Sequence, residues 1–450
     1  MPDGYDAVVI GAGPAGEVAI SQLLAQGLRV ALVERELLGG ECAYWACVPS
    51  KTLLRPGETR GEASRVAGLD TPAQHWPAVA AYRDFMIRGL DDSKQLQEYR
   101  EEGVDVYKGE GRIAGRGAVE VGETKLATER IILATGTDPS IPAIEGLAEA
   151  GFWTNREATT LSELPDSVII LGGGPVGVEL AQFFARFEVT VTLVQSEDRL
   201  VPREEPAAAK LIAKALEADG IELRLGAGVE SVRRADGKVT VSLSDGEAVE
   251  AGELLVATGR KPRVAGIGLE SVGIEPGKRG IEVDERCRAG EGVWAIGDVT
   301  GVMPFTHVGK YQARIAAADI AGESPRASYE AIPRVVFSDP ELAAVGLTEE
   351  KALEKGLELS RSQIKLRDVL TRPWTYEQDP RGDLGLLVDR KRKVLVGAWA
   401  VAPLASEWIH QAALALKTET PVAVLRDTVA QFPTFSEAYL KGLEALEPAV

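Results

Sequence analysis

Histidine and cysteine are both scarce in this chain, which has three of each among 450 residues. So few cysteines argue against a disulfide scaffold, and the absence of any Cys/His cluster argues against a metal centre. The chain also lacks an apolar run of about 18 residues, the length that a membrane-spanning helix needs. An excess of 68 acidic over 50 basic residues gives a net charge of −18, which disfavours nucleic acid and anionic membranes as partners.

The length predicts two to four domains. The stretch 5-YDAVVIGAGPAG-16 begins so close to the N-terminus that we expect no signal peptide and a cytoplasmic protein. Two of the cysteines, Cys42 and Cys47, lie close together in 39-GGECAYWACVPSK-51. In a cytosolic protein such a pair is more typical of catalysis or metal binding than of structural cross-linking. We interpret the third, Cys287, as a small buried side chain.

An internal duplication is the strongest organisational signal. The stretch 7-AVVIGAGPAGEVAI-20 reads as a strand, a glycine-rich turn and a helix, and 168-VIILGGGPVGVELA-181 repeats it. Glycines with this spacing allow a tight turn and the close approach of a pyrophosphate to a helix N-terminus. In each copy a second strand ends at the same offset, at Glu34 and at Gln195. Each copy later contains a similar strand, 131-IILATGT-137 or 254-LLVATGR-260, so we predict two dinucleotide-binding domains.

The two copies differ in ways that bear on the nucleotide. The first carries an insertion that contains the cysteine pair and the helix-like region 78–102. Its Glu34 is suited to bind an adenosine ribose, whereas the second copy has neutral Gln195, followed by Ser196, Arg199 and Arg203. Without a carboxylate to repel a 2′-phosphate, the second copy slightly favours NADPH over NADH. The alternative is that the two arginines are solvated surface charges.

Together these motifs resemble the pyridine nucleotide–disulfide oxidoreductases, the family of lipoamide dehydrogenase, glutathione reductase and mercuric reductase. The resemblance rests on GG-x-C-x4-C-x-P-S-K at 39–51, both glycine turns, both ATG stretches and 296-IGD-298. It implies an α/β fold with two Rossmann-like dinucleotide-binding domains and a C-terminal α+β dimerisation domain. The expected domains are an FAD-binding domain at 1–160 and 284–325, an NAD(P)-binding domain at 161–283 and a dimerisation domain at 326–450.

The resemblance also implies which residues meet the cofactors. FAD would be contacted by Gly11, Gly13, Pro14, Ala15, Gly16, Glu34, Gly40, Lys51, Gly115, Thr135, Gly136, Asp298, Thr306 and His307. NAD(P)H would be contacted by Gly172, Gly174, Pro175, Val176, Gly177, Glu179, Gln195, Arg199, Val229 and Gly259. Lys51 and Glu179 would pair where the nicotinamide meets the flavin, and a helix starting near Thr306 would direct its N-terminus at the flavin ring.

In the implied reaction, hydride passes from NAD(P)H through FAD to a Cys42–Cys47 disulfide and then to an acceptor. Cys47 would face the flavin, and the Cys42 thiolate would attack the substrate. Each active site would draw on both subunits of a homodimer, because the family's C-terminal H-P-T-x-x-E segment reaches the partner's disulfide. Here that segment begins with Phe432 and keeps Glu437. Phenylalanine replaces an acid–base group that typically contributes about 10²–10⁴-fold. His410 is the remaining candidate, although a lone helical histidine is usually a surface residue.

The chain departs from the family elsewhere, so several functions stay open. Glu41 replaces a threonine, and bulky Tyr44 and Trp45 predict a narrower, more apolar pocket. Missing C-terminal cysteines and the absence of a preceding metal-binding domain argue against a mercuric reductase or a large thioredoxin reductase. The leading hypothesis is an FAD-dependent NAD(P)H oxidoreductase with an unidentified small-molecule acceptor. The alternatives are thioether cleavage like that of 2-ketopropyl-coenzyme M oxidoreductase/carboxylase, where phenylalanine also replaces the histidine, direct flavin-to-quinone transfer, or a flavoprotein binding module.

Overall fold

The computed structural model describes residues 4–449, and the chain forms two compact units. Unit 1 contains the chain up to Pro49, Ala81–Ser140 and Gly259–Ser328. Unit 2 contains Ser50–Ala80, Ile141–Thr258 and the chain from Tyr329 onward. Two helices cross the unit boundaries along the chain, α3 (Cys47–Arg65) and α4 (Trp76–Met86).

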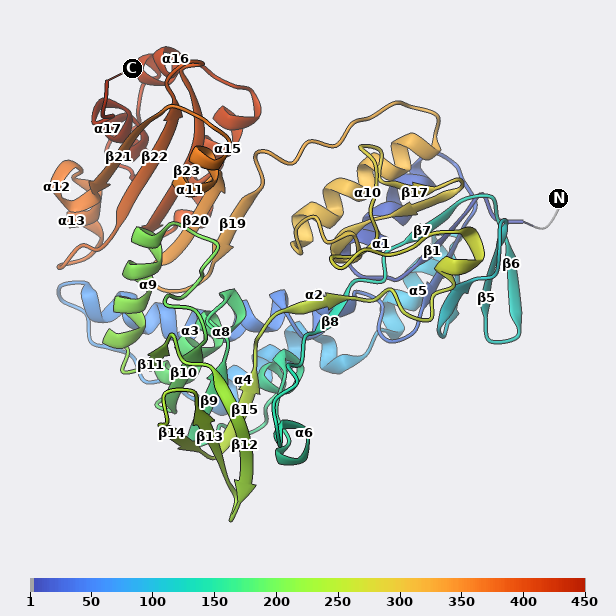
Figure 1. The fold of residues 1–450 in the computed structure, drawn as a ribbon, viewed down its shortest axis with the longest axis horizontal. Coiled ribbons are helices and arrows are strands. Elements are labelled where there is room, and N and C mark those ends of the chain that lie inside the picture. Colours follow the sequence, from blue (N-terminus) through green and yellow to red (C-terminus); the bar gives the residue numbers. More distant parts are fainter. Residues whose placement is uncertain (1–3, 450) are drawn as a thin grey trace. The chain divides into compact units, whose positions relative to one another are not determined.

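Unit 1 is built on a six-stranded sheet (Figure 1). In spatial order its strands are β17 (Arg288–Gly290), β18 (Val293–Ala295), β7 (Ile131–Leu133), β1 (Ala7–Ile10), β2 (Val30–Glu34) and β3 (Asp105–Lys108). All neighbours are parallel except β17 and β18. The central strand β1 reads AVVI and is buried throughout, as expected for a parallel strand covered on both faces.

Helices cover this sheet and position the nucleotide turn. Helix α1 (Pro14–Ala25) begins with a proline, whose ring is pre-organised for the first helical turn. It packs against α10 (Thr306–Ile320) (Figure 1). Other elements of this unit are α2 (Gly40–Tyr44), η1 (Arg88–Leu90), α5 (Ser93–Glu101), η2 (Leu269–Val272), η3 (Gly297–Thr300), the sheet of β4 (Gly111–Ile113), β5 (Ala118–Val121) and β6 (Thr124–Ala127), and the pair β8 (Thr137–Pro139) and β16 (Arg260–Pro262).

Unit 2 contains the second copy of the duplicated motif. Its parallel sheet has the order β11 (Glu222–Leu225), β10 (Thr190–Gln195), β9 (Ser167–Leu171) and β15 (Glu253–Val256). The order β15-β9-β10-β11 repeats the order β7-β1-β2-β3 of unit 1. Around it lie α6 (Leu147–Ala150), α7 (Asn155–Thr159), α8 (Pro175–Arg186), α9 (Pro206–Ala218) and the antiparallel sheet of β12 (Val229–Ala235), β13 (Lys238–Leu243) and β14 (Ala248–Ala251).

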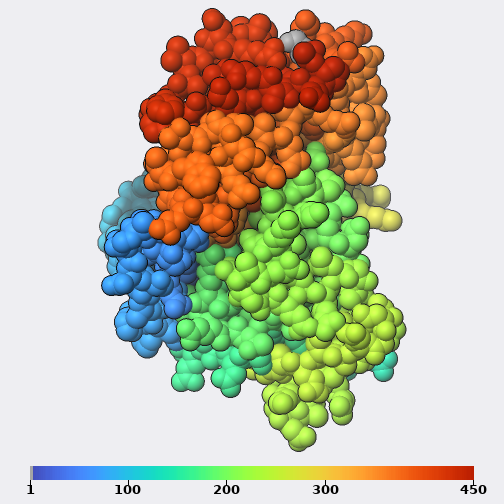
Figure 2. Space-filling model, turned by 90° about the vertical axis from the view of Figure 1, so that its left-hand side faces the viewer, coloured from blue at the N-terminus to red at the C-terminus, as the bar shows by residue number. Residues whose placement is uncertain are grey.

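The C-terminal part of unit 2 is a five-stranded antiparallel sheet with helices. Its strands in spatial order are β19 (Pro333–Val336), β20 (Glu341–Gly346), β23 (Val394–Ala402), β22 (Asp383–Asp389) and β21 (Leu359–Lys365). Its helices are α11 (Glu349–Glu354), α12 (Leu366–Val369), α13 (Arg372–Tyr376), α14 (Ala405–Trp408), α15 (His410–Lys417), α16 (Val422–Asp427), η4 (Phe435–Glu437) and α17 (Ala438–Glu444). Its surface abuts that of residues 141–258, green in Figure 2, where Arg334 pairs with Glu204 at 2.7 Å.

The predicted fold class is confirmed, since two parallel βαβ sheets and a C-terminal α+β region are all present. Residues 259–283, which we expected beside the second nucleotide, pack in unit 1 instead. Strand β16 pairs with β8, and Ile267 and Ile281 join the core that contains Val8 and Ile10. The chain returns to unit 1 at Gly259 because these apolar side chains complete that core. Which nucleotide each domain binds stays a prediction.

Candidate redox site

The first glycine turn has the geometry of a dinucleotide cradle. A Cβ atom at Gly11 would lie 2.3 Å from the carbonyl oxygen of Ala134, and one at Gly16 would lie 1.9 Å from that of Gly11. At Gly13, by contrast, a Cβ would meet none of the described atoms within 4 Å. Two glycines therefore permit close packing, while the middle one leaves the helix N-terminus accessible to a pyrophosphate. Pro14 and Ala15 follow in the first turn of α1.

The second turn repeats this geometry. A Cβ at Gly172 would lie 2.5 Å from the oxygen of Ala257, and one at Gly177 would lie 1.8 Å from that of Gly172. Gly174 is open within 4 Å among the described residues. Pro175 and Val176 start α8. The same stereochemical requirements thus hold in both copies, and both fit a bound dinucleotide.

Glu34 and Gln195 occupy equivalent positions at the ends of β2 and β10. Oε2 of Glu34 accepts a hydrogen bond from the Ala12 N–H at 2.7 Å, and Oε1 of Gln195 accepts one from the Gly173 N–H at 2.9 Å. The Glu34 carboxylate keeps lone pairs for a ribose, whereas Gln195 keeps two N–H donors on Nε2. The two sites consequently differ in what they offer to an adenosine ribose, with an acceptor in one and a donor in the other.

The cysteine pair lies in two successive helices and belongs to unit 1. Cys42 is in the short helix α2, and Cys47 is the first residue of the 19-residue helix α3. Both are half-buried, and no disulfide joins them in this structure. The segment is anchored to the nucleotide turn, because a Cβ at Gly40 would lie only 2.8 Å from Cα of Gly13.

Thr306, the first residue of α10, contacts both sulfurs. Its Oγ1 donates to Sγ of Cys42 at 3.3 Å and lies 3.5 Å from Sγ of Cys47. A hydrogen bond with Cys47 and burial raise the pKa of the Cys42 thiol, while the Thr306 hydroxyl and the charge of Lys310 act in the opposite direction. Cys47 lies at a helix N-terminus, where thiolates are favoured. Burial and Cys47 thus disfavour the Cys42 thiolate, while Thr306, Lys310 and the start of α3 favour negative charge at the pair.

Glu41 and Tyr44, two of the departures from the family pattern, are engaged by other residues of unit 1. The Glu41 carboxylate lies 3.3 Å from Arg263 and 3.7 Å from Arg260. Tyr44 is fully buried in the interior of unit 1. Its ring packs over Gly39, and the narrower pocket that we expected from Tyr44 and Trp45 stays a prediction. Trp45 is half-buried, with its ring 5.7 Å from that of Tyr44.

The predicted flavin contacts around Asp298 also come together in unit 1. Asp298 lies in η3 and accepts a hydrogen bond from the Thr137 hydroxyl at 3.1 Å. Burial raises the pKa of Asp298, against the opposing influence of Arg260, Thr137 and Arg263. Thr135 and Gly136 both bond to Arg263, through a hydroxyl at 2.8 Å and a carbonyl at 3.0 Å respectively. A half-buried acid among donors suits hydroxyl groups such as those of a ribityl chain.

Lys51 and Glu179 form an ion pair in unit 2. Nζ of Lys51 lies 2.6 Å from Oε2 of Glu179, whose side chain is 7% exposed. Phe337 contacts both residues of the ion pair. Its backbone N–H donates to Oε1 of Glu179 at 3.0 Å, and its ring centroid lies 4.6 Å from Nζ of Lys51. Phe337 was not identified from the sequence, because nothing in 334-RVVFSDPELAAVGLT-348 marks it apart from its place after a strand.

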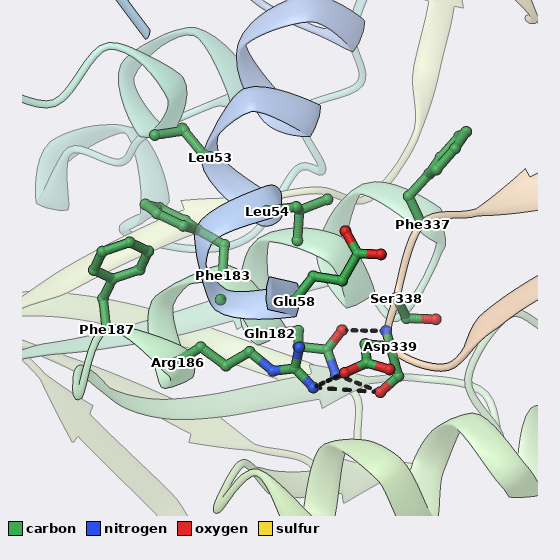
Figure 3. Close-up of a pocket in the computed structure, with 11 residues that line it drawn as sticks. Leu53, Leu54, Glu58, Gln182, Phe183, Arg186, Phe187, Phe337, Ser338 and Asp339 are labelled. Atoms are coloured by element: carbon green, nitrogen blue, oxygen red, sulfur yellow. Dashed lines mark hydrogen bonds and ion pairs between the residues drawn. The ribbon is translucent and has the colours of Figure 1, made fainter. Parts of the chain in front are cut away.

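A pocket beside this pair is lined by α3, α8 and residues 337–339 (Figure 3). Within it, Gln182 accepts from the Asp339 N–H at 2.7 Å. Asp339 pairs with Arg65, Arg186 and Arg381 at 2.9, 2.9 and 3.0 Å. Burial would raise the pKa of Asp339, but the three guanidinium groups hold it below its usual value. This buried network joins α3 to α8 and so supports the positions of Lys51 and Glu179.

The C-terminal segment presents Phe432 outward. Its ring is 67% exposed, whereas Oε2 of Glu437 is buried without a hydrogen-bond partner among the described residues. His410 starts α15 and is exposed, and exposed His307 stacks on Phe305 with ring centroids 5.2 Å apart. The segment thus keeps a buried carboxylate oxygen where the family pairs a glutamate with histidine.

The remaining predicted residues lie in loops or at strand ends. Gly115 connects β4 to β5, where its N–H donates to Oγ of Ser271 at 3.0 Å. Val229 starts β12, Gly259 precedes β16, and Arg199 bonds the Pro202 carbonyl at 3.1 Å. The structure gives the positions of these residues, and their roles stay predictions.

The described residues, 4–449, also bear on membrane and metal-binding functions. None of the helices in that range is both long and apolar enough to cross a membrane. Within the same range, no set of three or more His, Cys, Asp or Glu side chains is arranged to hold a metal ion.

Known proteins match along nearly the whole chain. Residues 5–318 match the family model described as pyridine nucleotide-disulphide oxidoreductase, and residues 332–442 match its dimerisation domain. A mercuric reductase from Bacillus cereus is 34% identical over 96% of this chain and 70% of its own length. A dihydrolipoyl dehydrogenase from Chlorobaculum tepidum is 34% identical over 96% and 95%.

Solved structures agree with these sequence matches. The HOCl-induced flavoprotein disulfide reductase RclA from Escherichia coli superimposes with a TM-score of 0.87 and 28% identity, over 97% of this chain and 99% of that one. A Cu(II) complex of the same protein gives a TM-score of 0.86. The predicted family and enzyme class are thereby confirmed.

Proposed function

The chain belongs to the pyridine nucleotide–disulphide oxidoreductase family, and we propose that its electrons leave through the Cys42–Cys47 pair. One observation carries this proposal. Gly40 packs on Gly13, so the cysteine helix is seated directly on the nucleotide turn of the same unit. A pair placed there purely for cross-linking would close a very short loop and contribute little stability.

The first turn suits FAD and the second suits NAD(P)H. When bound, FAD accepts hydride from the nicotinamide and supplies two electrons to the sulfurs. Gly11, Gly13, Gly16 and Glu34 hold the first dinucleotide, while Lys51 and Glu179 form the charged pair at the nicotinamide. The slight preference for NADPH is supported by Gln195, whose Oε1 is engaged by Gly173. Its Nε2 donors are then available to a 2′-phosphate, with Arg199 and Arg203 following in sequence.

The two cysteines have different roles in the proposed reaction. Two electrons and one proton convert the disulfide into one thiolate and one thiol, and a hydride equivalent supplies both. Cys47, at the start of α3, holds the charge, and Cys42 holds the proton. Proton exchange between the sulfurs then makes Cys42 the attacking thiolate.

A homodimer with shared active sites is supported by the dimerisation domain at 332–442. Apolar side chains are strongly exposed there, with Leu414 at 66% and Val429 at 94%, as expected for a surface that another copy covers. In this arrangement Phe432 reaches the partner's cysteines and transfers no proton. The acceptor is therefore one that reacts at sulfur without an acid–base group from position 432.

Soft metal ions are one acceptor class with this property. They bind thiolates directly and need no proton for electron uptake. Two of the similar proteins carry metal ions in their names or titles, mercuric reductase and the Cu(II) complex of RclA. The other acceptor classes are a thioether cleaved with carboxylation, which would use the same aprotic pocket, and a quinone reduced directly at the flavin.

An anaerobic titration of the FAD-loaded protein with NADPH tests the proposal, with free thiols counted and flavin absorbance followed. About two new thiols per chain, together with a long-wavelength thiolate–flavin band, are expected. Flavin bleaching without new thiols would place the cysteines off the electron path and favour quinones. Replacing Cys42 and Cys47 by serine should then leave acceptor reduction unchanged. Turnover assays with Cu(II), Hg(II), a 2-ketopropyl thioether and a quinone separate the acceptor classes.

A further inference from the structure

The Thr306 hydroxyl lies within hydrogen-bond distance of both sulfurs of the pair. Its Oγ1 lies 3.3 Å from Sγ of Cys42 and 3.5 Å from Sγ of Cys47. A threonine hydroxyl carries one proton, so it donates to one sulfur at a time and changes partner by rotating about a single bond. Hydrogen bonds to an ionised acceptor are roughly twice as strong as neutral ones, so the proton follows the negative charge.

The surroundings of Thr306 favour negative charge at the sulfurs. It begins the 15-residue helix α10, and Cys47 begins the 19-residue helix α3. The partial positive ends of two helices therefore meet at the pair. Phe305, the residue before α10, has no polar side-chain atom with which to cap the helix. The first-turn amides of α10 are consequently not satisfied by a capping side chain.

Of the charged groups near the pair, a lysine favours a thiolate and the carboxylates are engaged by other side chains. Lys310, one turn along α10 from Thr306, favours the Cys42 thiolate. On α2 the Glu41 carboxylate would oppose a thiolate, but it is engaged by Arg260 and Arg263. On α1 Glu17 accepts a hydrogen bond from Gln95 at 2.5 Å. The titratable neighbour that works against ionisation of Cys42 is Cys47 itself.

We propose that Thr306 is a positioning residue for the reduced cysteine pair, whose hydroxyl, aided by Lys310, holds the thiolate that an imidazole at position 432 would otherwise stabilise. The inference rests on the proposed function and deepens it. Reduction breaks the S–S bond, and two electrons with one proton give one thiolate and one thiol. The hydroxyl follows the charge when the proton moves from Cys42 to Cys47. Proton exchange within the reduced pair thus yields a Cys42 nucleophile although Phe432 offers no proton acceptor.

The test uses FAD-loaded protein reduced anaerobically with dithiothreitol and then freed of it. Iodoacetamide alkylation of Cys42 is followed by peptide mass spectrometry across pH 5–9. Thr306→Val keeps the shape and removes the hydroxyl, and it should raise the pH of half-maximal alkylation by about half to one unit. Thr306→Ser should restore the wild-type profile. Lys310→Gln should raise the midpoint, whereas Lys125→Gln, an exposed lysine of the same unit, should not.

Two results would overturn the inference. If the pH profile of Cys42 alkylation in Thr306→Val superimposes on that of the wild type, the hydroxyl does not stabilise the thiolate. If Thr306→Ser shifts the pH of half-maximal alkylation as far as Thr306→Val does, the effect comes from side-chain shape and not from the hydroxyl. If Thr306→Val loses FAD, Thr306→Ala provides the same comparison with serine. Because dithiothreitol reduces the pair here, failure of NADPH to produce thiols would overturn the proposed function separately.

Discussion

Nζ of Lys51 lies 2.6 Å from Oε2 of Glu179, and the ring of Phe337 covers the ammonium group from 4.6 Å. The two charged residues are 128 positions apart in the chain. The phenylalanine comes from a third region, after strand β19. A charged pair held on two sides in this way has one preferred geometry, which is what a nicotinamide-binding site requires.

Lys51→Met should slow flavin reduction by NADPH about 10- to 100-fold, because it leaves the buried Glu179 carboxylate without its cation and displaces the nicotinamide. It should also lower the free energy of unfolding by about 1–3 kcal/mol. Stopped-flow absorbance and urea titration measure the two effects. Lys214→Met, at an exposed position on α9, is the matched control. Equal rates of flavin reduction in the two variants would contradict a role of Lys51 in nicotinamide binding.

Gln195→Glu should lower the ratio of kcat/KM for NADPH to that for NADH by at least about tenfold, since a carboxylate repels a 2′-phosphate. The new side chain can still accept the Gly173 N–H, so the turn itself should be retained. Steady-state kinetics with both coenzymes give the ratio. Glu34→Gln is the control in the other copy, where FAD retention should fall and the coenzyme ratio should stay constant. An unchanged ratio in Gln195→Glu would contradict the assignment.

Phe432→His should increase reduction of a small dithiol-forming disulfide by at least about tenfold, because the imidazole supplies an acid–base group. The buried Oε2 of Glu437, which has no partner among the described residues, should orient it. The pH–rate profile should gain an ionisation near the histidine range, about 6.5. Phe432→Tyr controls for the change of ring. Adding Glu437→Gln to Phe432→His should reverse the gain, and a gain that persists would assign no role to Glu437.

Glu341→Gln should stabilise the protein at neutral pH. Burial, together with Glu58 and Glu407, raises the pKa of Glu341 from 4.5 to about 6, despite a hydrogen bond from Ser406. A raised folded-state pKa contributes stability that is complete below pH 4.5 and is lost as the pH rises through 6. The variant should therefore match the wild type at pH 4 and exceed it by about 1–2 kcal/mol at pH 7.5. Urea unfolding at the two pH values measures this. An equal difference in stability between variant and wild type at both pH values would contradict the raised pKa of Glu341.

Local features of the chain predicted much of this architecture. The two glycine turns impose short-range stereochemical demands, at Gly11 and Gly16 and again at Gly172 and Gly177. Such demands are met by residues close in sequence, so they can be recognised before the fold is known. The ends of β2 and β10, at Glu34 and Gln195, could be aligned for the same reason.

The sequence by itself determined the family, the duplicated nucleotide-binding units, the cysteine pair and the loss of histidine at position 432. Only the tertiary structure decided which side chains surround them. It directed Tyr44 into the core, Glu41 towards Arg263, and Thr306 against two sulfurs that lie more than 250 residues earlier in the chain. The Glu41 and Thr306 contacts join residues more than 200 positions apart in sequence, so they arise from the packing of the folded chain rather than from any local pattern.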